Sequence, residues 1–265
     1  MDTGTERMIA YVEDGVGWIV YNNPDKHNAM SIDMLQAVPR ICEAFATDPE
    51  VRVVVLRGTG ERAFISGADI AQLDSGELSR PSVPTERDMA DNAGTTGLAA
   101  LEKPIIAMIH GWCLGGGVMV ALTADIRICA DDAQFGIPAA KLGVGYPYEA
   151  TNELVSLVGP GQASEIMFAG RRIDAVEAER IGLVNRQVPK HELEATVRAL
   201  AADIAANAPL SHVAHKRSIQ SAARGGPSGE GDAIHHAIAA AWASDDAVEG
   251  RRSFLERRPS QFTGK

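Results

Sequence analysis

Apolar runs separated by short polar or glycine-containing segments divide the first two thirds of the chain into alternating strands and helices. Residues 9–13 and 16–21 flank Asp14-Gly15, a dipeptide typical of a tight hairpin turn. A buried strand is expected over 51–57, because its residues 53–56 are continuously apolar, and the apolar run at 105–109 is also typical of a strand. This alternation predicts an α/β fold.

The remaining elements of this part follow from the same patterns. Further strands are expected over 126–130, 134–136 and 183–188, and helices over 31–45, about 85–101, 118–122, 150–157, 161–169 and 175–181. Ser31 can cap the first of these helices, and Pro39 is expected to kink it. Gly159-Pro160 separates two of the later helices. The polar segment 76–84 is expected to be a mobile surface segment near the site.

The character of the sequence changes near residue 191, after which only helical patterns follow. They cover about 191–207, 209–223, 230–243 and 246–257, with Pro209 at a first turn, where helices tolerate proline. The glycines around Pro227 predict a flexible joint. We therefore expect a core over residues 1–195 and a helical region over 196–265 that makes oligomer contacts.

Two turns made of small residues each follow a buried strand. Gly115, Gly116 and Gly117 open a helix that is apolar all round, which predicts a buried helix with bare N–H groups at its start. Such a helix start suits an anion, either permanent or formed during a reaction. The turn at 66–69 exposes the N–H of Ala68, so the two turns could place two donors on one oxygen. Alternatively, the glycines only allow a strand and a helix to pack closely.

Short motifs along nearly the whole chain resemble those of the crotonase (enoyl-CoA hydratase/isomerase) superfamily in order and spacing. They are Asn-Ala-Met at 28–30, Phe-Ile-Ser-Gly-Ala-Asp-Ile at 64–70, Lys-Pro-Ile-Ile-Ala at 103–107, Gly-Trp-Cys-Leu-Gly-Gly-Gly at 111–117, Ala-Asp-Ile-Arg at 124–127 and Phe-Gly-Ile-Pro at 135–138. The resemblance implies a spiral of strand-strand-helix turns with a helical C-terminal part that trimerises. It also implies an oxyanion hole for an acyl-CoA thioester, with the N–H groups of Ala68 and Gly116 as donors.

The same resemblance implies positions that contact coenzyme A, which would be part of the substrate rather than a separate cofactor. These positions are Lys26, Ala29, Asp69 and Ile70 in one chain, and Phe254 and Arg257 reaching across from a neighbouring subunit. The family implies a homotrimer or a hexamer made of two trimers. Other interpretations remain: a solvated loop lysine for Lys26, a structural turn residue for Asp69, and an ordinary amphipathic helix for the tail.

The chain departs from the family at the acids that hydratases use to activate water. The resemblance places Met119 and Ala139 at these two glutamate positions, and neither side chain exchanges protons. General acid–base catalysis contributes roughly 10²–10⁴-fold, so isomerase, decarboxylase (lyase) or other acyl-CoA chemistry is favoured over ordinary hydration. Tyr146 and Glu149 are the candidate replacements, unless they only cap and pack the next helix. The alternative function is a non-catalytic acyl-CoA-binding homologue.

Tyr146 belongs to a motif that is similar to one in the methylmalonyl-CoA decarboxylase relatives, namely Leu-Gly-Val-Gly-Tyr at 142–146. A decarboxylase needs a stabilised enolate and a group that orients the carboxylate, but no general base. Glu149 could instead serve an isomerase, which moves one proton between carbons with one base. The sequence leaves these two chemistries open.

Charge, cysteine content and apolar runs argue against several classes of partner and location. The formal net charge of the 265 residues is −10, which disfavours nucleic acid as a partner. Cys42, Cys113 and Cys129 show no metal or redox spacing, which predicts reduced, buried thiols in a cytoplasmic protein. Neither a secretory leader nor an apolar run of about 18 residues is present, so no membrane association is expected.

Two other candidate sites are weaker. A dinucleotide site is suggested by Gly-Thr-Gly-Glu-Arg-Ala at 58–63, but Phe-Ile-Ser-Gly follows where a helix should begin. His110 stands at a strand end, where a structural role is the usual one. The histidines of the tail lack acidic or cysteine partners at ligand spacing, so we expect no metal site.

Overall fold

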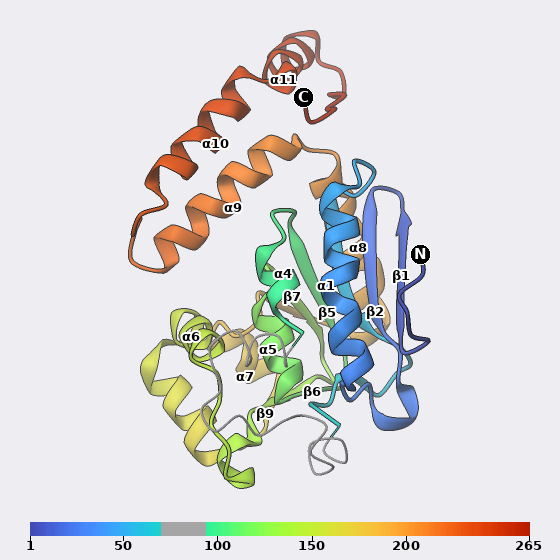
Figure 1. Cartoon of the computed structure of the whole chain (residues 1–265), viewed down its shortest axis with the longest axis vertical. Helices are drawn as coiled ribbons and strands as arrows, with labels where there is room; N and C mark the ends of the chain where they lie inside the picture. The colour runs from blue at the N-terminus through green and yellow to red at the C-terminus, as the bar shows by residue number, and fades with distance from the viewer. Residues whose placement is uncertain (70–93) are drawn as a thin grey trace.

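The computed structural model describes residues 1–69 and 94–265, and two sheets form its framework (Figure 1). The larger sheet has the strand order β1 (Met8–Glu13), β2 (Val16–Tyr21), β3 (Val53–Gly58), β5 (Ile105–Ile109), β7 (Ile126–Ala130) and β10 (Arg186–Val188). The smaller sheet has the order β4 (Ala63–Ile65), β6 (Trp112–Leu114), β8 (Gln134–Gly136) and β9 (Ile173–Asp174).

The chain winds through these sheets in repeated strand-strand-helix turns, as expected. The first strand of each turn joins the larger sheet and the second joins the smaller one: β3 then β4, β5 then β6, β7 then β8. Neighbours in the larger sheet are parallel except for the β1–β2 hairpin, which is antiparallel. Strand β6 was not predicted, because its three residues, directly before the glycines, are too few to show a strand pattern of their own.

Helices cover the sheets and form the end of the chain. They are α1 (Ile32–Thr47), α4 (Thr96–Ala100), α5 (Gly116–Leu122), α6 (Tyr148–Ala169), α7 (Ala175–Arg180), α8 (Leu193–Ala205), α9 (Pro209–Ala223), α10 (Gly231–Ala243) and α11 (Asp245–Glu256), with the short 3₁₀ turns η1 (Pro24–Lys26), η2 (Pro138–Leu142) and η3 (Lys190–Glu192).

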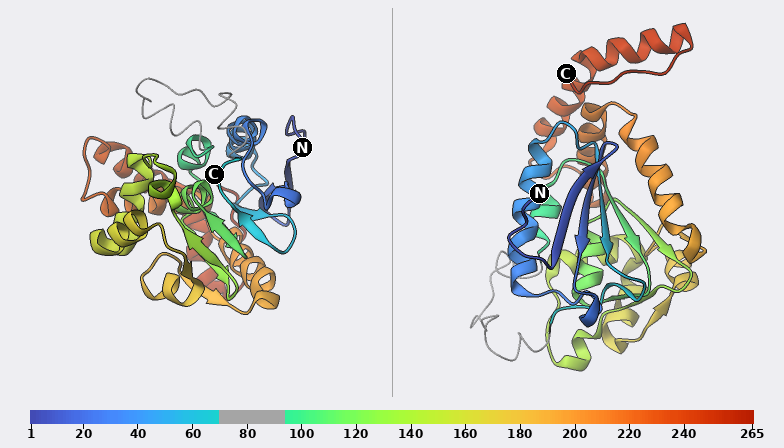
Figure 2. Two further views of the ribbon diagram at one scale, coloured as in Figure 1. Left: turned by 90° about the horizontal axis from the view of Figure 1, so that it is seen from below. Right: turned by 90° about the vertical axis from the view of Figure 1, so that its right-hand side faces the viewer.

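The central strands β2, β3 and β5 of the larger sheet are buried on both faces because their residues are almost all apolar. Val53 and Val55 lie in the apolar cluster that includes Val197 of α8, whereas Val54 and Leu56 lie in the cluster that includes α1. Side chains of a strand alternate between faces, so one continuous apolar run supplies both clusters. The side view shows α1 and α8 on opposite sides of the sheet (Figure 2).

The structure departs from some of the predicted details and confirms another. Ser31 stands at the N-cap of α1, but its hydroxyl donates to the Asp33 carboxylate rather than capping a main-chain N–H. Pro39 lies inside a helix that continues to Thr47. Gly159 (φ 76°, ψ 162°) interrupts α6, as the sequence predicted. The expected mobile segment 76–84, and most of the helix expected over 85–101, lie outside the described residues.

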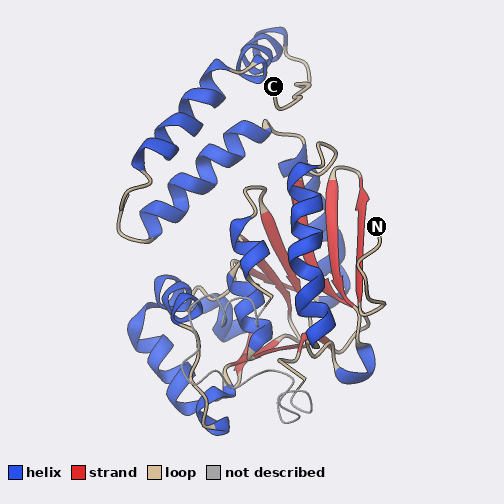
Figure 3. Cartoon of the chain, viewed as in Figure 1, coloured by secondary structure: helices blue, strands red, loops and turns tan. Residues whose placement is uncertain are grey.

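The helices at the end of the chain extend away from the sheets (Figures 1 and 3). The predicted division after residue 195 falls inside α8, whose Val197 and Ala201 are buried against the larger sheet; the extending helices begin at Pro209. Lys216 anchors α9 to the core, since its ammonium donates to the Lys103 carbonyl (3.0 Å) and the Asp125 carboxylate (2.9 Å). Within the described part of the chain, no helix combines the length and apolar character needed to cross a membrane.

Candidate active site

The glycine turn places one bare N–H group at the start of α5. Gly115 has φ 51° and ψ −115°, a conformation that side chains disfavour, and its N–H donates to the Gly136 carbonyl at 2.8 Å. The helix begins at the next residue, Gly116. The N–H of Gly116 therefore points out of the helix start without a partner in the preceding turn.

The second turn exposes the N–H of Ala68 through its pairing with Met30. The N–H of Met30 donates to the Gly67 carbonyl, and the N–H of Asp69 donates to the Met30 carbonyl, both at 2.8 Å. Parallel pairing of this kind leaves the N–H of the intervening Ala68 facing the other way. Neither Ala68 nor Gly116 has a partner for its N–H within residues 1–69 and 94–265.

The two turns approach each other closely. A Cβ atom at Gly116 would lie 3.8 Å from the Ala68 nitrogen and 2.4 Å from the methyl group of Met30. A Cβ at Gly117 would lie 2.2 Å from the Ile65 carbonyl oxygen. Glycine at 117 is therefore required for α5 to pack against β4, whereas a side chain at 116 would have to displace the flexible end of Met30. The approach brings the two unpartnered donors close together.

Asn28 holds the loop that supports this arrangement, and the sequence motifs had drawn attention to it only as part of Asn-Ala-Met. Its fully buried side chain accepts from the Asn23 N–H at 2.9 Å and donates to the Thr59 carbonyl (2.9 Å) and the Ala63 carbonyl (2.8 Å). Its φ is 56°, which asparagine tolerates better than most residues. Apart from that motif, the sequence indicated this supporting role only through an asparagine in a polar loop.

Two of the predicted coenzyme A positions contact each other beside the turn. The Lys26 ammonium donates to the Asp69 carboxylate at 2.6 Å, and the Lys26 side chain is 54% exposed whereas that of Asp69 is 9% exposed. Ala29 is buried in the same loop, and its N–H donates to the Lys26 carbonyl at 3.0 Å. Ile70, predicted for the same role, lies outside the described residues. A cation therefore stands beside the Ala68 donor and remains open to solvent.

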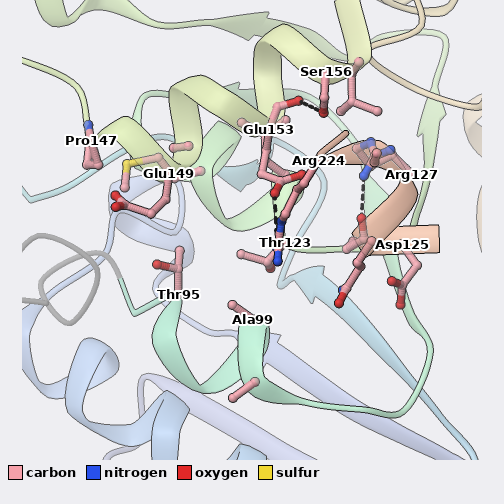
Figure 4. A pocket seen from close by; sticks show the side chains of 18 of the residues that line it. Thr95, Ala99, Thr123, Asp125, Arg127, Pro147, Glu149, Glu153, Ser156 and Arg224 are labelled. Atoms are coloured by element: carbon pink, nitrogen blue, oxygen red, sulfur yellow. Dashed lines mark hydrogen bonds and ion pairs between the residues drawn. The ribbon is translucent and has the colours of Figure 1, made fainter. Parts of the chain in front are cut away.

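A cavity of about 540 Å³ opens among α4, α5, α6 and α9 (Figure 4). Met119 lies in its wall, one turn of α5 after Gly116, although neither Gly116 nor Ala68 belongs to the wall itself. Apolar residues such as Leu122 and Leu157 line part of it, and α4, α6 and α9 complete the walls. The arrangement offers a partly apolar space one helical turn from the unpartnered N–H of Gly116.

Tyr146 contacts the residue that precedes the Gly116 donor. Its hydroxyl donates to the Gly115 carbonyl at 3.0 Å, next to the N–H of Met119. Burial raises the pKa of Tyr146 well above its usual range, so the phenol stays protonated at neutral pH. The structure brings this residue to the glycine turn, with its proton directed at the main chain.

Glu149 reaches the cavity itself. It occupies the first turn of α6, is exposed, and lines the cavity together with Met119 and Pro147 (Figure 4). Ala139 lies in η2, where it packs against the main apolar core. Glu149 is thus the predicted proton-transfer candidate whose side chain lines the cavity, whereas Tyr146 does not belong to its wall.

The structure keeps His110 away from the cavity. Its ring is 5% exposed, its Nε2 has no hydrogen-bond partner among the described residues, and it is not part of the cavity wall. Burial lowers the pKa of His110, and the positive charges of Lys190 and Arg57 lower it further. This surrounding favours a neutral, structural histidine. In the described ranges no His, Cys, Asp and Glu side chains gather in a group that could hold a metal ion.

The tail positions lie apart from the site within one chain. Phe254 is 82% exposed near the end of α11, and Arg257 follows at its C-cap with φ 55°. Helix α11 stands at the far end of the extending helices (Figure 1), and neither residue lines the cavity. A single chain does not bring them to the donors.

The comparisons with known proteins agree on one family. The profile of the enoyl-CoA hydratase/isomerase family matches residues 12–265. The chain is similar to a crotonyl-CoA hydratase from Syntrophomonas wolfei, with 33% identity over 98% of this chain and 99% of that protein. It is also similar to a carnitinyl-CoA dehydratase from Citrobacter koseri, with 36% identity over 83% of this chain and 85% of that protein.

A solved structure extends this likeness to three dimensions. It is that of a protein from Hyphomonas neptunium assigned to the same family, with a TM-score of 0.90, 33% identity and full coverage of both chains. The expected fold is thereby confirmed, apart from its trimerisation region.

Proposed function

Because the chain belongs to the enoyl-CoA hydratase/isomerase family, we propose that it is an enzyme that acts on an acyl-CoA thioester through an enolate. The observation that carries the proposal is the adjacency of two N–H groups, from Ala68 and Gly116, that lack partners in the described chain. The thioester oxygen would rest between them. Each such donor contributes about 2.7–4 kcal/mol of transition-state stabilisation in enzymes where one has been removed.

Glu149 would move the proton in this reaction. Its carboxylate takes a proton from the carbon next to the thioester carbonyl, and the electron pair moves onto the oxygen held by Ala68 and Gly116. With a 3-enoyl ester, the carboxylic acid so formed returns the proton to the carbon at the far end of the double bond, which leaves the 2-enoyl thioester and a free carboxylate. Tyr146 would act as a positioning residue, because its O–H fixes the Gly115 carbonyl directly before the Gly116 donor.

Ordinary hydration is disfavoured by the side chains at the two positions that resemble the hydratase glutamates. Met119 lines the cavity and Ala139 packs on the core, and neither can hold or activate a water molecule. The relatives named above are a hydratase and a dehydratase, so this chain would use the same oxyanion site with a different proton-transfer group.

Coenzyme A binding and assembly complete the proposal. Lys26 would exchange part of its contact with Asp69 for a phosphate of coenzyme A, with Ala29 and Ile70 nearby. Phe254 and Arg257 would approach the coenzyme A of a neighbouring subunit in a trimer or in a hexamer of two trimers. The exposed Trp242, Phe254 and Leu255 side chains support such an assembly, because an isolated chain would leave large apolar groups in water.

Deuterium exchange tests enolate formation without knowledge of the physiological substrate. Butanoyl-CoA and a but-3-enoyl-CoA would be incubated with the protein in D₂O and analysed by mass spectrometry. We expect deuterium at the carbon next to the carbonyl and conversion of the 3-enoyl ester to its 2-enoyl isomer. Binding of these esters without exchange or conversion would favour the non-catalytic acyl-CoA-binding alternative. Absence of binding at millimolar concentration would contradict the acyl-CoA assignment itself.

Crotonyl-CoA hydration tests the argument about the missing acids. The unmodified protein should hydrate crotonyl-CoA far more slowly than the ordinary enzyme range of about 1–10³ s⁻¹. The double variant Met119→Glu/Ala139→Glu should be faster if the oxyanion site is intact, although a buried carboxylate can destabilise the fold. A rate in the ordinary range for the unmodified protein would show that the argument is wrong.

A further inference from the structure

The far part of the cavity contains an ion pair where an unbranched fatty acyl chain would need an apolar wall. Glu153 of α6 and Arg224, directly after α9, line the cavity and approach each other at 3.4 Å. Their side chains are 37% and 55% exposed. Figure 4 shows the pair beside Thr123, further along the cavity than Glu149 and Pro147. Glu153 lies one turn of α6 beyond Glu149, so this part of the wall carries a charged pair.

The other charged groups of this wall have their own partners. The Asp125 carboxylate accepts from Lys216 at 2.9 Å and from the Ile105 N–H at 2.7 Å. The Arg127 guanidinium donates to the Leu183 carbonyl at 3.0 Å and to the Ala124 carbonyl at 2.5 Å. Within residues 1–69 and 94–265, Glu153 and Arg224 meet through one long contact, and Arg127 lies near enough to interact electrostatically with Glu153. Such a contact is weak and easily rearranged.

The Glu153–Arg224 pair offers a hydrogen-bond acceptor, the carboxylate, and a hydrogen-bond donor, the guanidinium. Its net charge is zero. A hydroxyl group can donate to Glu153 and accept from Arg224 at once. A carboxylate would meet the negative charges of Glu153 and Glu149, and a cation would meet Arg224. A methyl-ended chain would displace water from both charged groups without replacing their hydrogen bonds, which is unfavourable. The chemistry of the wall thus selects an uncharged hydrogen-bonding group.

The position of Glu153 and Arg224 in the cavity determines how long an acyl chain must be to reach them. Thr123 follows Gly116 by seven residues, or roughly 10 Å along the helix. An extended acyl chain covers that distance with roughly eight carbon atoms. We propose that Glu153 and Arg224 are specificity-determining residues, and that the substrate is an acyl-CoA of medium length with a hydroxyl group at or near the end of the chain. This proposal rests on the acyl-CoA function above and specifies its substrate class.

Calorimetry with matched ligands tests the proposal on the unmodified protein. Butanoyl-CoA ends before the pair and serves as the reference for the function itself. We expect ω-hydroxyoctanoyl-CoA to bind about tenfold more tightly than octanoyl-CoA, the low end of what hydrogen bonds to charged groups contribute. Octanedioyl-CoA, with its second carboxylate, should bind more weakly than the hydroxylated ester.

Variants then assign the preference to the pair. The double variant Glu153→Leu/Arg224→Met should bind octanoyl-CoA more tightly and lose the tenfold preference, while its affinity for butanoyl-CoA stays unchanged. Arg224→Gln, a milder change of a half-exposed side chain, should reduce the preference if the double variant fails to fold. Arg180→Met is the matched control, since Arg180 forms a similar weak pair with Glu177 (3.6 Å) but does not line the cavity.

The outcomes separate this proposal from the function on which it rests. Equal or tighter binding of octanoyl-CoA, or a preference for octanedioyl-CoA, would overturn the hydroxyl assignment while butanoyl-CoA binding upholds the acyl-CoA function. A preference that survives the double variant would show that other residues recognise the hydroxyl group. Failure of every ester, butanoyl-CoA included, would remove both proposals together.

Discussion

Substituting Tyr146 by phenylalanine and, separately, Glu149 by glutamine distinguishes positioning from proton transfer. In the structure the Tyr146 hydroxyl makes a neutral hydrogen bond of 3.0 Å to the Gly115 carbonyl. Such a bond contributes about 0.5–1.5 kcal/mol. If all of it were lost from the transition state, Tyr146→Phe would slow the reaction by roughly 2- to 12-fold, since about 1.4 kcal/mol corresponds to a factor of ten.

Glu149→Gln should have a much larger effect. The substitution keeps the size and the position of the side chain at the cavity wall but removes its ability to take a proton. General acid–base groups contribute roughly 10²–10⁴-fold, so the rate should fall by at least about 100-fold. The affinity for the ester should change little, because the oxyanion donors and the coenzyme A contacts remain.

The assay is the initial rate of deuterium uptake by butanoyl-CoA, with thermal unfolding as the check on folding. Tyr146→Phe should lower the free energy of unfolding by about 1 kcal/mol and leave the pH dependence of the rate unchanged. Thr151→Val is a matched control, since it also removes a hydroxyl that donates to a main-chain carbonyl, that of Pro147 (2.9 Å), at a residue outside the cavity wall. A loss above about 100-fold for Tyr146→Phe, with a smaller loss for Glu149→Gln, would refute the assigned roles.

Further outcomes follow from glycine packing, burial and charge. Gly117→Ala should lower the free energy of unfolding in chemical denaturation by about 1–3 kcal/mol, because its Cβ would lie 2.2 Å from the Ile65 oxygen. Gly145→Ala is the control and should be nearly neutral, because a Cβ there would have no atom within 4 Å. Burial lowers the pKa of His110 below 6.5. The unfolded chain therefore binds that proton first, and the free energy of unfolding should decrease as the pH falls below about 6.5, less steeply in His110→Gln. Lys26→Met should weaken calorimetric binding of coenzyme A about threefold to tenfold at low salt, without changing affinity for a pantetheine thioester that lacks the nucleotide.

The elements were largely predictable because local patterns and tertiary packing agree. The continuous apolar run at β3 predicted a strand covered on both sides, and α1 and α8 provide that cover. The Asp14-Gly15 turn predicted the β1–β2 pairing. Strand β6 was missed because its three residues carry no period of their own; they pair with β4 and β8 only after the spiral has formed.

The candidate site was predictable only in part. Glycines at 115–117 indicated where bare N–H groups would stand, because glycine permits both the positive φ and the close approach. The support from Asn28 was not visible, since its three hydrogen bonds join the backbones of Asn23, Thr59 and Ala63 across the fold. The role of Tyr146 was equally open, because the direction of a hydroxyl proton depends on a carbonyl distant in the sequence.

The separation between main-chain and side-chain functions explains how one fold can support different reactions. The two donors are peptide N–H groups, and their positions depend on glycine packing against Ile65 and on the Met30 pairing, which also shape the core. Loss of either feature would damage folding as well as catalysis. The Glu149 side chain has no such structural role, because it is exposed at the start of α6, whereas Met119 belongs to the apolar core and Ala139 packs against it. In the proposed function, charge stabilisation therefore rests on the main chain, whereas proton transfer rests on a side chain that can change without loss of the fold.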